Sequence, residues 1–136
     1  MTVSRRWLIV AAGMLICSGC AGKSVNLLKG SPSEGEQKLS AGIKSYEEAN
    51  YKDSAKLLQE ALKKGLSDRN DRVKAHKYLA FIHCVSGRKK LCTIEFKKIF
   101  ILDPDFELQP AEEGHPLWGP VYRSVKGAKA PAPAKK

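Results

Sequence analysis

The sequence predicts an all-α fold made of two helical hairpins and a short C-terminal capping helix. Apolar residues recur every three to four positions from residue 35 to 101, and hardly any segment shows the alternation typical of strands. Turn-forming residues interrupt this pattern near Ala49-Asn50, at 65–68, at Ser86-Gly87 and at 103–105. Four helices in two hairpins fit between these breaks.

The expected helices follow in chain order from these breaks. The apolar residues that recur at helical spacing are Leu39, Ile43 and Tyr46, then Leu58, Ala61 and Leu62, then Leu79, Ile82 and His83. Each group places its side chains on one face of a helix, so each helix can pack against a neighbour.

The two hairpins also resemble each other. Gly42 and Ala80, the small residues within the first helix of each hairpin, lie 38 positions apart, and the second copy continues with Gly87, Phe96 and Pro104. This pattern resembles the tetratricopeptide repeat, which has a period of about 34 residues. The connector around 65–73 accounts for the excess. Two such repeats leave a terminal apolar face, so we expect a cap.

The segment after residue 105 is the candidate for this cap. Pro116 and Pro120 exclude one long helix, but a short helix that begins near Trp118 can hold Pro120 in its first turn. The side chains expected to pack on the second hairpin are Trp118, Val121, Tyr122 and Val125. Alternatively, residues 115–122 form a docking motif, in which His115, Trp118 and Tyr122 would contact a partner.

The N-terminus predicts export. Arg5-Arg6, an apolar run from residue 7 to 17 and then Ser18-Gly19-Cys20 are typical of a secretory signal peptide at 1–19. The small residues before Cys20 resemble the bacterial lipobox, although Cys17 stands where the family usually has Leu. This resemblance implies a covalent lipid on Cys20; a simple secreted protein and an uncleaved anchor are the alternatives.

By the same resemblance, the lipidated protein carries several acyl chains, which anchor a protein stably. In many such lipoproteins an Asp after the cysteine retains the protein at the inner membrane. Here the residue is Ala21. We therefore expect the bacterial outer membrane, with the protein facing the periplasm.

Composition divides the rest of the chain. Residues 20–34 are rich in Gly, Ser and Lys and predict a tether, 35–126 predict one small helical domain, and 127–136 predict a disordered basic tail. The full chain has a net charge of +10, and loss of Arg5 and Arg6 lowers the Lys and Arg count from 24 to 22 against 14 acids. This surplus favours an anionic lipid or an acidic protein as partner, and export excludes nucleic acid.

Cys84 and Cys92 form an even pair in an oxidising compartment, and they lie almost equally far from the Gly87 turn. A disulfide between them is therefore expected. In the repeat register, however, Cys92 faces the partner helix while Cys84 leans toward the concave groove. Two buried, unreactive thiols remain the alternative.

No combination of residues predicts catalysis or a metal site. His76 and His83 share one helix face, but Cys84 points about 100° away from His83 and no fourth ligand is near in sequence. The sequence gives no nucleophile with a base and a third group. We expect neither an enzyme nor a cofactor other than the lipid on Cys20, and no small-molecule substrate.

The concave groove is the predicted binding surface. The residues expected to line it are Leu39, Ile43, Tyr46, Lys77, Phe81 and Cys84. An extended or helical peptide would suit such an apolar surface with one cation. Alternatively, the capping residues fill the groove. The charged outer positions, including those at 88–90 and 97–98, are expected to be solvated.

Residues 75–125 are also similar to a named family. AHKYLAFIHC at 75–84 and GHPLWGPV at 114–121 resemble the TssQ-type lipoproteins associated with type VI secretion. The resemblance implies an accessory, protein-binding component of that apparatus in the envelope. The alternatives are a pilotin-like lipoprotein that assists assembly of another envelope machine, and an envelope regulator whose basic tail contacts cell wall or lipid.

Overall fold

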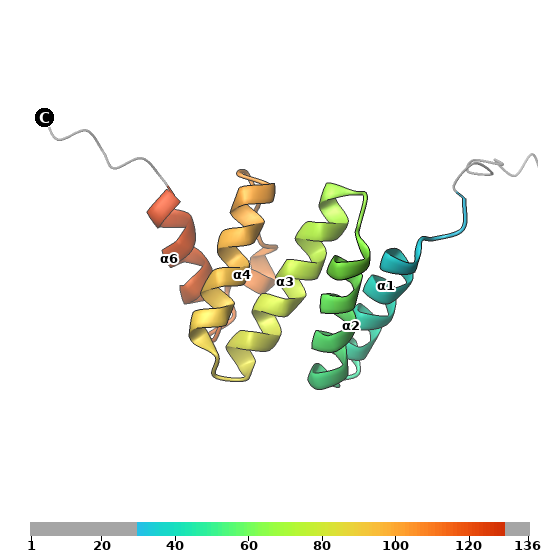
Figure 1. The fold of residues 1–136 in the computed structure, drawn as a ribbon. Helices are drawn as coiled ribbons and strands as arrows, with labels where there is room; N and C mark the ends of the chain where they lie inside the picture. Colours follow the sequence, from blue (N-terminus) through green and yellow to red (C-terminus); the bar gives the residue numbers. More distant parts are fainter. Residues whose placement is uncertain (1–29, 130–136) are drawn as a thin grey trace, which may run out of the picture.

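The computed structural model describes residues 30–129, and all regular structure in this range is helical. The elements are α1 (Glu34–Glu47), α2 (Tyr51–Lys64), α3 (Arg69–Val85), α4 (Lys89–Leu102), α5 (Pro110–Glu113) and α6 (Gly119–Lys129). The first four form two antiparallel hairpins that lie side by side, as predicted (Figure 1). None of these helices is long and apolar enough to cross a membrane.

The first hairpin depends on small and capping residues. Ser33 and Glu36 form a reciprocal capping box at the start of α1. Gly42 lets α2 approach closely, because a Cβ at this position would lie 2.9 Å from the Leu58 side chain. Ser54 then donates a hydrogen bond of 2.7 Å to the Gly42 carbonyl. The two helices are thus held at short range.

The second hairpin turns at Gly87, whose φ of +72° favours glycine. Cys84 of α3 and Cys92 of α4 are joined across this turn by a disulfide, with their Cα atoms 5.3 Å apart. The bridge therefore fixes the start of α4 against the end of α3.

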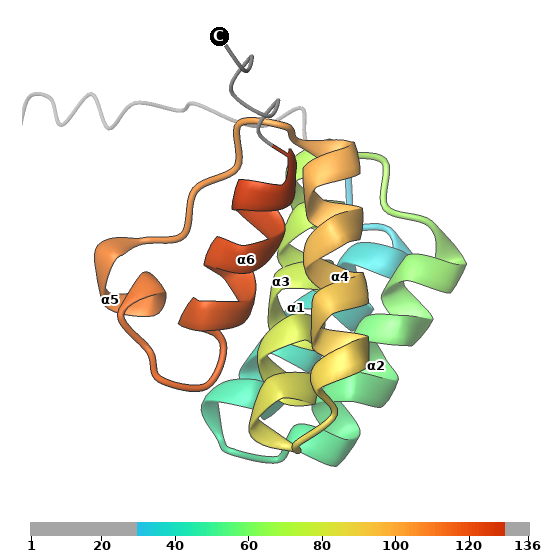
Figure 2. The same cartoon turned by 90° about the vertical axis from the view of Figure 1, so that its left-hand side faces the viewer.

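The C-terminal segment covers the second hairpin. Helix α6 packs against α4, and α5 lies beside α6 (Figure 2). Trp118, Val121, Tyr122 and Val125 are all buried in one cluster with Phe96 and Phe100. The predicted capping helix is therefore present, and its apolar residues pack as expected.

Two details differ from the sequence-based expectations. The short helix α5 was not predicted, and α6 continues to Lys129, so the predicted tail boundary at 127 is wrong. Gly127, where the tail was expected to begin, lies within α6. The signal peptide, Cys20, most of the tether and residues 130–136 lie outside the described range.

Candidate functional site

The predicted concave groove begins on α1, where the structure leaves little open surface. Leu39 is 4% exposed, and Ile43 packs against the same cluster. The Tyr46 ring lies 4.9 Å from the Tyr78 ring and 5.5 Å from the Tyr51 ring, measured between centroids. Burial raises the pKa of Tyr46 to about 12. These side chains contribute to the core.

On α3 the groove is filled by the cap. Phe81 is 2% exposed and stacks on Trp118 with their ring centroids 4.2 Å apart. Lys77 donates a 2.5 Å hydrogen bond to Glu112 of α5. Of the two expectations for the groove, the structure agrees with the second: core packing and the cap occupy it, so Leu39, Lys77 and Phe81 do not line an open groove.

The residues of the alternative docking motif are likewise engaged within the fold. The Trp118 indole N–H donates to the Glu112 carbonyl at 2.7 Å, and the His115 ring stacks against the indole. Tyr122 is fully buried and its hydroxyl donates to Glu107 at 2.9 Å. Burial, followed by the hydrogen bond with Glu107, raises the pKa of Tyr122. Trp118 and Tyr122 therefore act as the cap.

A small polar cluster lies between α3 and α4. His76 Nδ1 lies 2.6 Å from one oxygen of Glu95, and Lys98 donates to the other at 2.7 Å. Burial would raise the pKa of Glu95, but the hydrogen bonds with His76 and Lys98 outweigh it and hold the pKa below its ordinary value. The carboxylate is thus satisfied although it is buried.

His83 is the exception in this region. Its side chain is buried and its Nδ1 has no hydrogen-bond partner among residues 30–129. Burial lowers the pKa of His83, and the positive charge of Arg88 lowers it further. Within the described range, no three potential metal-ligating side chains are grouped to hold an ion.

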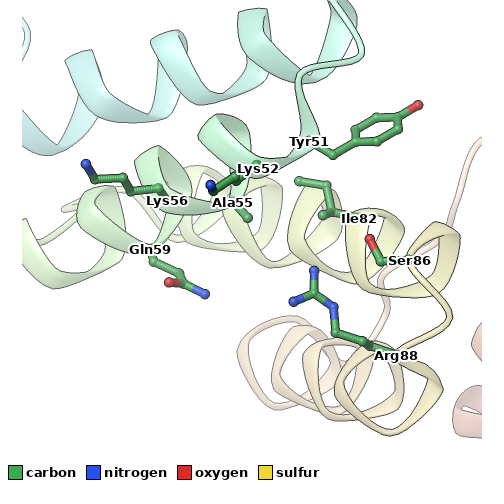
Figure 3. Close-up of a pocket in the computed structure, with 8 residues that line it drawn as sticks. All are labelled: Tyr51, Lys52, Ala55, Lys56, Gln59, Ile82, Ser86 and Arg88. Atoms are coloured by element: carbon green, nitrogen blue, oxygen red, sulfur yellow. The ribbon is translucent and has the colours of Figure 1, made fainter.

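An open concavity lies on another side of α3. We call it the basic pocket; it has a volume of about 330 Å³ and is lined by Tyr51, Lys52, Ala55, Lys56, Gln59, Ile82, Ser86 and Arg88. Figure 3 shows Gln59 of α2 and Arg88 on opposite sides of this space, whereas the Tyr51 ring extends away from it. Ile82 follows Phe81 and so faces about 100° away from the filled groove.

Local structure explains how the basic pocket is formed. Lys52, Lys56 and Gln59 are spaced by four and then three residues, which places them on one face of α2. Arg88 follows the Gly87 turn, and its backbone N–H donates to the His83 carbonyl at 2.8 Å. Ala55 and Ser86 are small and leave the space between the polar side chains open.

The electrostatics of the basic pocket favour an anion. Lys52, Lys56 and Arg88 contribute three cations, no carboxylate lines the space, and none of the three forms an ion pair with another residue in 30–129. The Arg guanidinium can bind a carboxylate or phosphate through two parallel hydrogen bonds. Ile82 is fully buried beneath the pocket, and the part-exposed Ala55 adds an apolar contact, so the pocket suits an anionic group next to a small apolar one.

Sequence reasoning missed this pocket. Arg88 was expected to be solvated, and Lys52, Lys56 and Gln59 were not singled out. The spacing of the α2 residues places them on one helix face, but Glu48 and Glu60 lie four positions from Lys52 and Lys56, so the sequence gives no sign of an uncompensated cluster.

Comparison of the chain with protein-family models, with characterised proteins and with solved structures finds no match.

Proposed function

We propose that this protein is a lipid-anchored adaptor at the bacterial outer membrane, facing the periplasm, and that it binds an acidic segment of a protein partner. The observation that carries this proposal is the basic pocket, whose lining among the described residues holds three cations and no carboxylate. The type VI secretion apparatus is the proposed source of the partner.

Two features support the compartment. The N-terminal residues resemble an exported lipoprotein, and Cys84 and Cys92 form a disulfide. Disulfides persist in oxidising spaces and are rare in the cytoplasm. A periplasmic location agrees with both features.

The assignment to type VI secretion depends on the resemblance to TssQ-type lipoproteins. The two segments that carry this resemblance, 75–84 and 114–121, pack on each other through Phe81 and Trp118. They therefore specify the capped hairpin that supports Arg88, and of the residues that line the basic pocket they include only the buried Ile82.

The chemistry of the basic pocket defines the ligand that we propose. A carboxylate would bind between Arg88 and the lysines, while the part-exposed Ala55 would contact a neighbouring apolar side chain. A volume of about 330 Å³ is at the lower end for binding sites and suits a few residues of a peptide. We therefore propose a short acidic segment with an adjacent apolar residue.

Photo-crosslinking in cells tests this proposal. A photoreactive amino acid is placed at Gln59 in the basic pocket or at Lys44 on α1 as an exposed control, and the captured proteins are identified by mass spectrometry. We expect capture of a secretion-apparatus subunit from position 59 only. Arg88→Glu should abolish this capture, whereas Lys63→Glu, which changes the net charge equally outside the pocket, should preserve it.

The alternative outcomes are informative. Capture of a secretin or pilus subunit would replace the type VI assignment with the pilotin-like one. No protein captured from position 59 in a properly lipidated chain would contradict protein binding at this site. The mass of the N-terminal peptide tests the anchor separately, since an unmodified Cys20 would overturn it.

A further inference from the structure

We propose that the outer face of α4 rests on an anionic lipid membrane; this inference relies on the lipid anchor in the proposed function. Leu91, Ile94 and Ile101 of α4 are 41%, 44% and 79% exposed. Their spacing of three and seven residues places them on one side of the helix. We call these three residues the α4 face.

The opposite side of α4 is also apolar. Cys92, Phe96 and Ile99 are completely buried in the core of the second hairpin. Apolar side chains therefore lie on two opposite sides of α4, with lysines between them. In the described range these three side chains stay partly exposed, so the α4 face is available to a surface outside this range.

Positive charges surround the α4 face. Lys90 and Lys97 are exposed, and Lys98 extends from the same helix to Glu95. Beside it, a concavity of about 430 Å³ between α4 and α6 is lined by Lys97, Phe100, Ile101, Val125 and Ala128. Apolar side chains flanked by lysines are typical of helices that lie at the surface of anionic membranes.

A second copy of the chain fits this surface poorly. In a symmetric dimer the same lysines from both copies would approach one another, which is unfavourable. Three partly exposed side chains also give much less area than the roughly 800 Å² per partner of a stable interface. The charge pattern therefore favours an anionic surface over another copy.

The proposed anchor makes a small contact sufficient. Glu34, the first residue of α1, lies 14 positions after Cys20, and an extended chain of this length spans at most about 50 Å. The last turn of α4 lies at the same end of the bundle as the first turn of α1 (Figure 1). Tethering raises the effective concentration of the membrane, so even weak contact becomes populated.

Vesicle co-sedimentation tests the α4 face. The probe is the chain from residue 20 with Cys20→Ser, mixed with vesicles of phosphatidylethanolamine and phosphatidylglycerol or with neutral phosphatidylcholine vesicles. We expect binding to the anionic vesicles only, decreasing as salt rises. Ile94→Asn with Ile101→Asn should weaken it by about tenfold or more, since two apolar side chains leave the interface.

Matched control variants distinguish a specific contribution of the α4 face from a general effect of lost hydrophobicity or charge. Leu117→Asn changes an equally apolar, 49% exposed residue elsewhere and should leave binding unchanged. Lys90→Gln with Lys97→Gln should weaken binding more than Lys44→Gln with Lys63→Gln, although both pairs remove two charges. Circular dichroism verifies that each variant is folded.

Three results would overturn the proposal. The first is no binding to anionic vesicles at millimolar lipid, and the second is unchanged binding when Ile94 and Ile101 are replaced. The third is a dimer, seen by sedimentation analysis of the wild type, that is lost when these two residues are replaced. The last result would assign the face to a second copy. Because the probe carries no lipid, failure here is independent of whether Cys20 is acylated in cells.

Discussion

Ser54, Leu58 and Ala61 of α2 are followed 38 positions later by Cys92, Phe96 and Ile99 of α4, and all six side chains are completely buried. The outer positions behave differently. Asp53, Lys56 and Lys63 of α2 correspond to Leu91, Ile94 and Ile101 of α4. The repeat thus preserves the interior of the two hairpins and changes their outer surfaces from polar to apolar.

The two hairpins are also stabilised in different ways. In the first, Gly42 permits close packing and Ser54 adds a hydrogen bond to the backbone. In the second, a disulfide joins the helices and a separate cap covers them. A terminal repeat with no further neighbour needs such additional stabilisation.

The largest expected effect comes from removal of the cap contact. Trp118→Ala should lower the free energy of unfolding by about 3–5 kcal/mol, since the ring stacks on Phe81 and the indole N–H binds the Glu112 carbonyl. Urea unfolding measures this change. Tyr51→Ala, at a 37% exposed tyrosine of the first hairpin, should cost much less. If Trp118→Ala and Tyr51→Ala lowered the free energy of unfolding by similar amounts, the second hairpin would not depend on its cap more than the first hairpin depends on an exposed side chain.

The disulfide should have the next largest effect. Cys84 and Cys92 are eight positions apart, and closure of so short a loop contributes about 2–3 kcal/mol in the chain-entropy description. Reduction with dithiothreitol should lower the urea midpoint of the wild type by a corresponding amount. The Cys84→Ala and Cys92→Ala double variant serves as the control, and its midpoint should not respond to reductant.

The close contact in the first hairpin should have a smaller effect. Gly42→Ala places a Cβ 2.9 Å from the Leu58 side chain and 3.2 Å from its backbone nitrogen, so α1 and α2 must separate at a cost of about 1–3 kcal/mol. Gly127→Ala in α6 is the control, because a Cβ there meets nothing within 4 Å. It should stabilise the chain by up to about 1 kcal/mol. A neutral Gly42→Ala would contradict the packing described.

The smallest effect is a dependence on pH that belongs to the second hairpin. The folded pKa of His83 lies below its ordinary value of 6.5, chiefly because of burial, so the unfolded chain takes up a proton first. The free energy of unfolding is therefore highest above pH 6.5, where His83 is neutral in both states, and it decreases as the pH falls below 6.5. Thermal unfolding at pH 7.5, 6.5 and 5.5 measures this decrease. His83→Leu should flatten the profile in this range, and an unchanged profile would exclude His83 as its cause.

Much of the fold was predictable because local signals determine it. The turns at Gly87 and around residue 66 mark the helix ends, and the apolar spacing identified Trp118 and Tyr122 as cap residues. Helix α5 has only four residues, too few for a period to be recognised. That capping residues fill the groove was one of two expectations, but the contact of Lys77 with Glu112 of α5 is one that no local pattern encodes.

The candidate site was harder to predict than the fold. Lys52 and Lys56 lie on α2, while Arg88 follows the turn after α3, so only the packing of the hairpins brings the three together. In the sequence each resembles an ordinary solvated cation. The signal peptide and lipidation site, by contrast, were inferred from residues that are adjacent in the sequence. They lie outside residues 30–129 and stay predictions.

The disulfide has a consequence for the timing of activity. Arg88 lies inside the short loop that Cys84 and Cys92 close, so the bridge restricts the segment that carries this guanidinium. Under the proposed function the chain is exported, and its thiols would be reduced before that step, so Arg88 would have more conformational freedom to lose on binding. We therefore expect a newly made chain to bind its ligand more weakly in the cytoplasm than after oxidation, which would delay engagement of the partner until the protein has reached its destination.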